Sequence, residues 1–238
     1  MKKAQPDPLQ FLLDKYSLDI GKIDQISCGA KYSAVMLTNG NIGVCANLRS
    51  KISLKKHDLK IPDMNNFHHR ILLTAYFNAL LNYSNQYDNG GDMFELIDFS
   101  QYKSLVMIGL FYPIVRKLQN AGIPINIFDL NKTDEILTPI SEQKKYLKKA
   151  DAIILTGTAI FNKTFVDLIR NTNSNCEIFM LGPSSIMHQK ILEYKNMKFI
   201  FGSVFKKYDE RILEIIRNGG GTQRFLKFGR KVFISKNG

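Results

Sequence analysis

Small and hydroxyl-bearing residues follow directly after an apolar run in the stretch ILTGTAIFNKT. They stand where the run ends and a helix should begin: Thr156, Gly157, Thr158, Asn162 and Thr164. Free backbone N–H groups at the start of a helix favour anions, glycine lets the backbone approach a ligand, and Thr and Asn add side-chain donors. The spacing therefore predicts a binding site for an anionic or polar small molecule. The alternative is that Thr158 or Asn162 only caps the helix that follows.

Three other predicted strands end in residues of similar kinds. Gly109 ends one strand, Asp129 stands 20 positions later, and Gly182, Pro183 and Ser184 follow another strand. In open α/β sheets ligands bind at the carboxyl ends of strands, near the point where the strand order reverses, so we expect these loops to line one site. An acid at the end of a second strand often holds a nucleotide ribose, which makes Asp129 a candidate for cofactor binding. The alternative for Gly182 and Pro183 is a simple turn.

The motifs of dinucleotide binding and of nucleophilic catalysis are missing from the sequence. The Gly109 loop lacks the G-x-G-x-x-G pattern, and Phe111 and Tyr112 stand where glycines would admit a pyrophosphate. There is no G-x-x-x-x-G-K-[ST] loop either. No base accompanies the threonines, and no Ser-His-Asp set can be assembled from the spacing. The sequence therefore assigns no catalytic residue and leaves open whether the protein is an enzyme.

Metal-ligand patterns are also sparse. The chain has no C-x-x-C, no H-E-x-x-H and no paired acidic motif. Adjacent helical residues point about 100° apart, so His68 and His69 cannot easily chelate one ion together. Cys28 and Cys45 stand near predicted strand ends and could be neighbours, although buried inert thiols are the more common case. Cys45 and His68 are therefore only weak metal candidates, and the metal ligands otherwise stay unknown.

The composition is that of a globular cytoplasmic protein. The chain has 238 residues, of which 45% are hydrophobic, enough for one large domain or two small ones. No apolar run approaches the roughly 18–20 residues that span a bilayer, and the start shows no signal peptide. Three cysteines, odd in number and far apart, favour a reducing compartment over a disulfide framework. We expect a cytoplasmic location and no membrane association.

The formal charge of +12 would suit a protein that binds nucleic acid. The denser basic runs lie at residues 47–60 and 222–236, and neither resembles a helix-turn-helix, a zinc finger or an RNA-recognition signature. We therefore disfavour nucleic acid as a partner. An anionic small molecule would use the same positive field.

The first half of the chain is predicted to be a small mixed unit, with a hairpin turn at Asn39-Gly40. Strands are expected at residues 24–29, 33–37 and 42–46. Residues 67–83 are expected to form a helix that is apolar on most faces. The polar segment SNQYDNGGD then marks our boundary between a small α+β N-terminal domain, residues 1–92, and a second domain, residues 93–238.

The second half alternates strands and helices. Strands are expected at residues 104–109, 125–130, 152–155, 177–182 and 197–202. Helices are expected at residues 113–122, 163–171 and within 209–221, together with a basic helix capped by Ser141. The segments FLKF and KVFIS are expected to pair at an edge. This alternation predicts an α/β fold with a mostly parallel sheet, helices on both faces and right-handed connections.

Several stretches resemble the family known as putative heavy-metal chelation proteins. TGTAIFNKT, LGPSS, IRNGGG and VMIGLFYPIV are similar to its C-terminal domain, and NIGVCA and NALL to its N-terminal domain. The similarity covers most of the chain. It implies a first domain like the capping domain of enolases (enolase N-terminal-like), a Rossmann-like second domain, and a ligand-binding cleft between them. It also implies that Asn78, in NALL, faces the Thr-Gly-Thr loop and contacts a cofactor.

The resemblance further implies binding of a metal ion or of a metal-bearing or pterin-like cofactor. Thr, Asn, Ser and Gly do not hold heavy metals well, because those metals prefer thiolate and imidazole. Any metal is therefore expected to arrive with an organic ligand, or to use Cys45 or a histidine of the first domain.

Three functions stay open. The first is a cytoplasmic protein that binds a metal complex or an anionic small molecule, as in chelation or metal-cofactor handling. The second is a transferase or lyase with a nucleotide-like or pterin-like cofactor. The third is a charge-driven nucleic-acid or partner-binding module. The size of the chain is compatible with a homodimer, on base rates alone.

Overall fold

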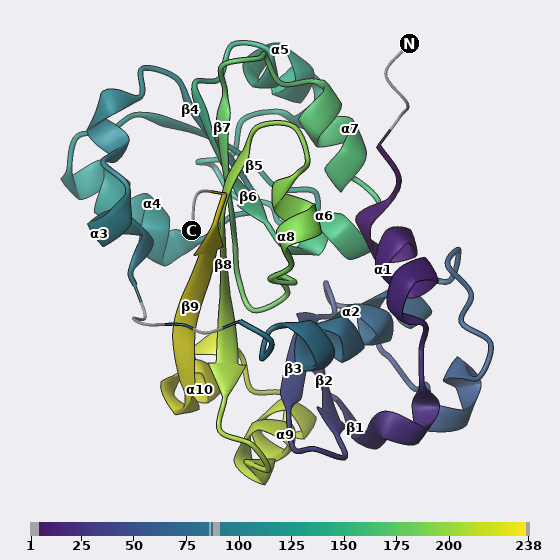
Figure 1. Ribbon diagram of the computed structural model, residues 1–238. Coiled ribbons are helices and arrows are strands. Elements are labelled where there is room, and N and C mark those ends of the chain that lie inside the picture. The colour runs from purple at the N-terminus through teal and green to yellow at the C-terminus, as the bar shows by residue number, and fades with distance from the viewer. Residues whose placement is uncertain (1–4, 86, 88–90, 237–238) are drawn as a thin grey trace.

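A computed structural model describes residues 5–85, 87 and 91–236 of the chain. The strands form two sheets (Figure 1). The smaller sheet is antiparallel and contains β1 (Ile23–Cys28), β2 (Tyr32–Leu37) and β3 (Ile42–Ala46) in that order. The larger sheet has the order β5-β4-β6-β7-β8-β9, in which β9 runs antiparallel to β8 and the other pairs are parallel. Its strands are β4 (Leu105–Ile108), β5 (Ile125–Phe128), β6 (Ala152–Thr156), β7 (Glu177–Leu181), β8 (Met197–Phe205) and β9 (Gly229–Ser235).

Helices connect and cover the strands. They are α1 (Pro8–Tyr16), α2 (Phe67–Leu81), α3 (Met93–Leu96), α4 (Tyr112–Asn120), α5 (Gln143–Leu147), α6 (Thr158–Phe161), α7 (Phe165–Arg170), α8 (Gln189–Leu192), α9 (Glu210–Arg217) and α10 (Thr222–Phe225). Short 3-10 turns occur at Ile20–Lys22, Lys56–Leu59, Phe99–Gln101, Ile140–Glu142 and Leu226–Phe228.

Alternate residues of the central strands face opposite layers of the larger sheet. In β4, Val106 joins the core cluster that contains Phe165 of α7, whereas Leu105 joins the cluster that contains Leu118 of α4. Successive side chains of a strand point to opposite faces, so helices cover both faces of this sheet. The predicted α/β fold class, a small three-stranded unit followed by a mostly parallel sheet, is confirmed.

Helix α2 is buried because it lies between the small sheet and the second half of the chain (Figure 1). Asn66 caps it by accepting hydrogen bonds from two backbone N–H groups of its first turn. Gly43 of β3 allows close packing, since a Cβ there would lie 2.0 Å from the Ala75 carbonyl oxygen. Within the described ranges, neither this helix nor any other is long and apolar enough to cross a bilayer.

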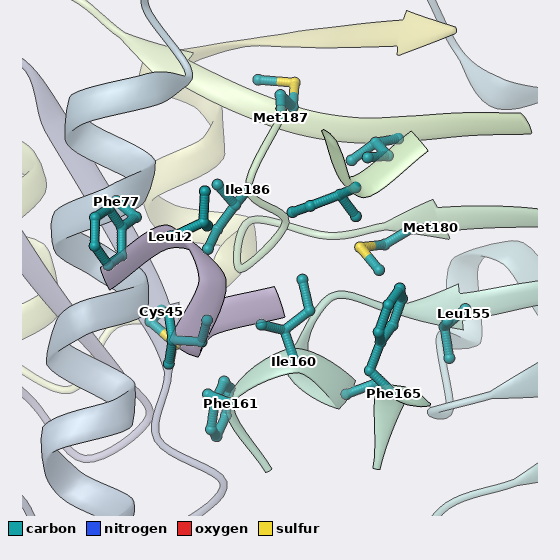
Figure 2. Close-up of a cluster of buried hydrophobic side chains, with 14 of the residues drawn as sticks. Leu12, Cys45, Phe77, Leu155, Ile160, Phe161, Phe165, Met180, Ile186 and Met187 are labelled. Atoms are coloured by element: carbon teal, nitrogen blue, oxygen red, sulfur yellow. The ribbon is translucent and has the colours of Figure 1, made fainter. Parts of the chain in front are cut away.

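One hydrophobic cluster joins the two halves. Figure 2 shows Leu12 and Phe77 from the first half packed with Ile160, Phe161 and Ile186 from the second. Burial of apolar surface is the dominant favourable term in folding, so this shared cluster fixes the small sheet relative to the larger one. The predicted boundary segment, residues 84–92, includes residues 86 and 88–90, which lie outside the described residues. The division into residues 1–92 and 93–238 stays a prediction.

Two predicted elements are wrong. Ser141 caps no helix, because it lies inside the 3-10 turn that follows Pro139, and α5 begins two residues later without a side-chain cap. The segment FLKF is helical rather than extended: Phe225 and Phe228 stand three residues apart, and Phe225 packs edge-on against Tyr32 with ring centroids 5.0 Å apart. KVFIS is an edge strand, but its partner is β8.

The cap of α8 is a pH-sensitive feature. His188 Nδ1 accepts the Lys190 backbone N–H at 3.1 Å, so Nε2 carries the proton in its 2.7 Å contact with the Tyr16 hydroxyl. Burial, and then the charge of Lys15, lower the pKa of His188 below its usual value, while Glu193 opposes this shift.

Stability should therefore rise with pH at this cap. The pKa of His188 is lower in the folded state than in the unfolded state. The stability that the neutral His188 cap provides is therefore complete above the unfolded pKa of about 6.5, and it is lost as the pH falls below that value. Asn also caps helices but does not titrate, so His188→Asn should flatten the dependence of unfolding free energy on pH between about 5 and 7.5. Urea unfolding of both proteins across that range measures it, and parallel curves would contradict the assignment.

Candidate functional site

A pocket of about 200 Å³ opens at the carboxyl ends of β4, β5 and β6. From β4 the chain passes to β5 on one side and then to β6 on the other, so the pocket lies at the point where the strand order reverses. Six of the residues predicted from the sequence line it: Gly109, Asp129, Thr156, Thr158, Asn162 and Thr164. Tyr32, Ala46 and Leu48 of the first half line it as well. The pocket is therefore bounded by both halves of the chain.

Local hydrogen bonds shape the Thr-Gly-Thr loop. The hydroxyls of Thr156 and Thr158 lie 3.1 Å apart, and the Thr158 backbone N–H donates to Thr156 Oγ1 at 3.3 Å. A bond between two hydroxyls uses only one of their two protons. One threonine hydroxyl therefore still has a proton to donate at the pocket wall.

Asn162 breaks the helix that the sequence predicts over residues 163–171. Its Oδ1 accepts the Thr164 backbone N–H at 3.1 Å and the Thr164 hydroxyl at 2.6 Å, while Lys163 takes a positive φ of 64°. The segment therefore forms two short helices, α6 and α7, instead of one. Within the part of the chain that the structure describes, Asn162 Nδ2 has no hydrogen-bond partner. It is a half-buried donor on the pocket lining.

Asp129 holds the loop after β4. Its Oδ2 accepts the Leu110 backbone N–H at 2.8 Å, and its Oδ1 accepts the Asn131 backbone N–H at 2.8 Å. Lys132 Nζ donates to the Leu110 carbonyl at 2.5 Å from the same side of the pocket. A carboxylate has about four acceptor sites, so two remain for other donors. The predicted role of Asp129 toward a cofactor stays a prediction beside this structural one.

Gly109 brings the ends of β4 and β6 together. Its φ of +90° is a conformation that glycine adopts readily, and a Cβ there would lie 2.8 Å from Thr156 Cβ. Phe111, two residues later, lines the pocket with its half-buried ring. The loop therefore contributes an apolar wall at the place where a dinucleotide fold would have further glycines.

The Gly-Pro-Ser loop does not line the pocket. Ser184 Oγ accepts the Ala46 backbone N–H at 2.9 Å, so this loop packs on the edge of the small sheet. Gly182 and Pro183 are half-buried beside it. Gly157 is buried against the same loop, since a Cβ there would lie 2.6 Å from Ser185 Oγ. We expected Gly157 and the Gly-Pro-Ser loop to line one ligand surface together with the threonines. They lie outside the pocket lining instead.

Asn78 meets the Gly-Pro-Ser loop instead of the Thr-Gly-Thr loop. Its Nδ2 donates to the Val44 carbonyl at 2.8 Å and to the Pro183 carbonyl at 3.2 Å. Asn78 is 1% exposed because α2 lies between the two halves, so its Nδ2 finds its partners within the protein. Its Oδ1 is buried and accepts no hydrogen bond from the described residues. Asn78 joins the two halves structurally and is absent from the pocket lining.

Arg70, which was not predicted from the sequence, supports the end of α6 next to the pocket residue Asn162. Its guanidinium is 2% exposed and donates to the carbonyls of Phe161 at 2.6 Å and Ile160 at 2.7 Å, and to Asp7 Oδ2 at 2.7 Å. It thereby holds the last carbonyls of α6, directly before Asn162. The signal was an arginine inside the apolar run HHRILL, because arginine is almost never fully buried unless it is paired.

The weak metal candidates do not form a metal centre. Burial strongly raises the pKa of the Cys45 thiol, and its side-chain hydrogen bond with Ser184 opposes this only in part, so the thiolate that binds metals is disfavoured. His68 Nε2 lies 2.8 Å from the Ser50 hydroxyl. Among residues 5–85, 87 and 91–236, no group of three or more His, Cys, Asp or Glu side chains could hold a metal ion. Cys28 of β1 and Cys45 of β3 both pair with Ser33 of the strand between them, β2. Both cysteines are free thiols.

Comparisons with known proteins agree with the fold. The model of the family described as "Putative heavy-metal chelation" matches residues 92–235. A protein of unknown function from this family in Pyrococcus horikoshii has a solved structure that is 21% identical, with a TM-score of 0.79, over 95% of this chain and 99% of that chain. A second, from Desulfitobacterium hafniense, is 18% identical with a TM-score of 0.73 and the same coverage. No curated protein matches the chain.

Proposed function

The chain belongs to the putative heavy-metal chelation family, and from this membership and the pocket geometry we propose that it binds an anionic or polar small molecule, or a metal complex of one, between its two halves. The observation that carries this proposal is the convergence of side-chain donors from Thr156, Thr158 and Asn162 at the strand-order reversal. We also propose a cytoplasmic location for this activity.

The shape of the pocket supports a small ligand. Its volume of about 200 Å³ is below the roughly 300–1,000 Å³ of pockets that enclose drug-sized molecules. Phe111, Leu48 and Tyr32 supply apolar surface, which restricts water and strengthens polar contacts inside. Lys132 stands in the lining and offers a partner to a negatively charged group, while Asp129 beside it offers acceptors to a donor. A ligand with one flat apolar part and one anionic or carbonyl-bearing part suits this arrangement.

The pocket residues do not fit a bare heavy-metal ion. Thr, Asn and backbone groups are hard oxygen and nitrogen donors, whereas heavy metals prefer thiolate and imidazole. Neither Cys45 nor His68 is among the pocket-lining residues. A metal would therefore enter already held by an organic ligand, and the protein would recognise that ligand.

The double substitution Thr158→Val with Asn162→Ala should abolish ligand binding without unfolding the chain. Valine keeps the shape of threonine but removes its hydroxyl. Alanine removes the Asn162 Nδ2 donor, which has no partner among the described residues, together with the Oδ1 that accepts from Thr164. The measurement is native mass spectrometry of protein purified without added metal, with elemental analysis of the same sample. We expect an organic mass, with or without a stoichiometric metal, that is retained by the natural protein and lost from the variant.

A matched control makes the same two chemical changes on the exposed surface, at Thr38→Val and Asn120→Ala. This control should keep the bound mass. Where no mass co-purifies, a thermal-shift screen of nucleotides, pterins and divalent ions applies the same comparison. Equal binding by both variants would remove the pocket from the proposal, and a bare metal ion bound equally by both would overturn the hard-donor argument.

A further inference from the structure

The positive charge of the chain is concentrated near its C-terminal end. Residues 206–236 contain nine Lys or Arg and three Asp or Glu, a net charge of +6 and half of the chain's +12. The fold gathers part of this charge in space, because the loop after β8 and the start of β9 lie side by side in the antiparallel pair that begins at Phe205 and Gly229. Two sequence segments that are separate along the chain thus supply one basic surface.

An open groove of about 510 Å³ lies on this surface. Four exposed cations line it: Lys206, Lys207, Lys227 and Arg230. Within the described residues, none of these four forms an ion pair with a carboxylate. Like charges that share an open surface without counter-ions raise its positive potential, which attracts anions.

Asp209, which follows Lys206 and Lys207 of the groove in the chain, is paired with an arginine. Asp209 accepts two hydrogen bonds from the Arg211 guanidinium, at 2.7 and 2.6 Å, and this contact lowers the pKa of Asp209. The same guanidinium lies 4.3 Å from the centroid of the Phe228 ring, which lines the groove. Phe228 is therefore fixed as an apolar and aromatic surface between cations.

The groove is separate from the pocket. It lies at the carboxyl end of β8, whereas the pocket lies at the carboxyl ends of β4, β5 and β6, and β7 stands between them in the sheet. The two linings share no residue. Tyr83, in the groove, uses its hydroxyl for the backbone of Ile42 and Phe205, so it belongs to the scaffold.

We propose that this groove binds the phosphate groups of a polyanionic ligand. Lysine ammonium groups and the planar arginine guanidinium are the side chains that bind phosphate oxygens, and Phe228 adds a face for an attached apolar group. Phosphates of this kind occur in free polyphosphates and along a nucleic-acid strand. The site stands independently of the function proposed for the pocket.

The test measures binding of a fluorescein-labelled single-stranded oligonucleotide by fluorescence anisotropy at several salt concentrations, with inorganic tripolyphosphate as competitor. The triple substitution Lys206→Gln, Lys207→Gln and Lys227→Gln should weaken binding on the order of tenfold and reduce the slope of log affinity against log salt by about two. Weak competition by tripolyphosphate would identify a nucleic-acid strand as the source. Tight, saturable tripolyphosphate binding with little oligonucleotide binding would identify a free polyphosphate.

The control removes the same charge elsewhere, with Lys144→Gln, Lys148→Gln and Lys149→Gln, three exposed lysines around α5. This variant should bind both probes as the natural protein does, and the Thr158→Val, Asn162→Ala protein should do so as well. Equal weakening by the two lysine variants would show that net charge alone attracts the probes and would overturn the site. Failure of both probes to bind would also overturn it.

Discussion

Replacing Arg70 by Met should lower the free energy of unfolding by about 2–4 kcal/mol, because it removes a buried cation that pairs with Asp7 and donates to two backbone carbonyls. The guanidinium is 2% exposed, so water cannot replace its hydrogen bonds. Its loss would leave the Phe161 carbonyl unpaired in the interior and Asp7 without its cation. The Ile160 carbonyl would keep the Lys163 backbone N–H, at 3.4 Å. Urea unfolding followed by circular dichroism measures the difference.

The same change should also weaken ligand binding in the pocket, since α6 would lose the contacts that hold its end before Asn162. Arg70→Lys should recover only part of the stability, because a single ammonium cannot match a planar fork that reaches three acceptors. Arg116→Met, on the exposed face of α4, is the matched control and should change stability by no more than about 0.5 kcal/mol. Similar losses for Arg70→Met and Arg116→Met would contradict the assigned role.

Several elements could be predicted because their patterns are local. β3 has the predicted bounds, residues 42–46, since a hairpin turn and an apolar run determine it without help from the rest of the chain. The gathering of Gly109, Asp129 and Thr156 could also be predicted. Parallel strands bring their carboxyl ends to one edge of a sheet, whatever the details of packing.

The contacts between the two halves could not be predicted in the same way. Asn78 and Ser184 are far apart in the chain, and their positions depend on how α2 packs between the sheets. No periodicity encodes that docking, so Asn78 was expected at the ligand and instead binds the Pro183 carbonyl. Arg70 was missed for a related reason: its partners are carbonyls, which every residue carries and which no sequence motif marks.

The Thr-Gly-Thr stretch combines a local pattern, which could be predicted, with a contact between distant segments, which could not. Its two threonines bond to each other and to the local backbone, as short-range turn chemistry predicts. Its glycine is required for a different reason. Gly157 has φ −59°, a conformation open to any residue, so the backbone conformation does not require a glycine there. The lack of space for a side chain does require one, because the loop after β6 lies directly against the loop after β7.

Gly157→Ala should therefore destabilise the protein by about 2–3 kcal/mol, in the upper part of the range for forcing an extra carbon into a packed interior. The new Cβ would lie 2.6 Å from Ser185 Oγ, 2.7 Å from the Ser185 nitrogen and 2.9 Å from the Ser184 carbonyl carbon. Two of these three atoms are backbone, and Ser184 is held to Ala46 by a hydrogen bond, so a side-chain rotation cannot relieve the clash. The two loops must separate, which moves Thr158 in the pocket.

Gly221→Ala is the matched control. Gly221 has φ −104°, and a Cβ there would lie 3.6 Å from its nearest neighbour, an ordinary contact. Its stability should change by less than about 1 kcal/mol, with a small gain from the stiffer unfolded chain. Chemical denaturation of both variants measures the loss of stability, and native mass spectrometry of the ligand-bound state measures the loss of binding. Loss of bound mass in Gly157→Ala alone would tie the loop contact to the pocket, and equal stability of the two variants would mean that the loops are not packed as closely as this geometry requires.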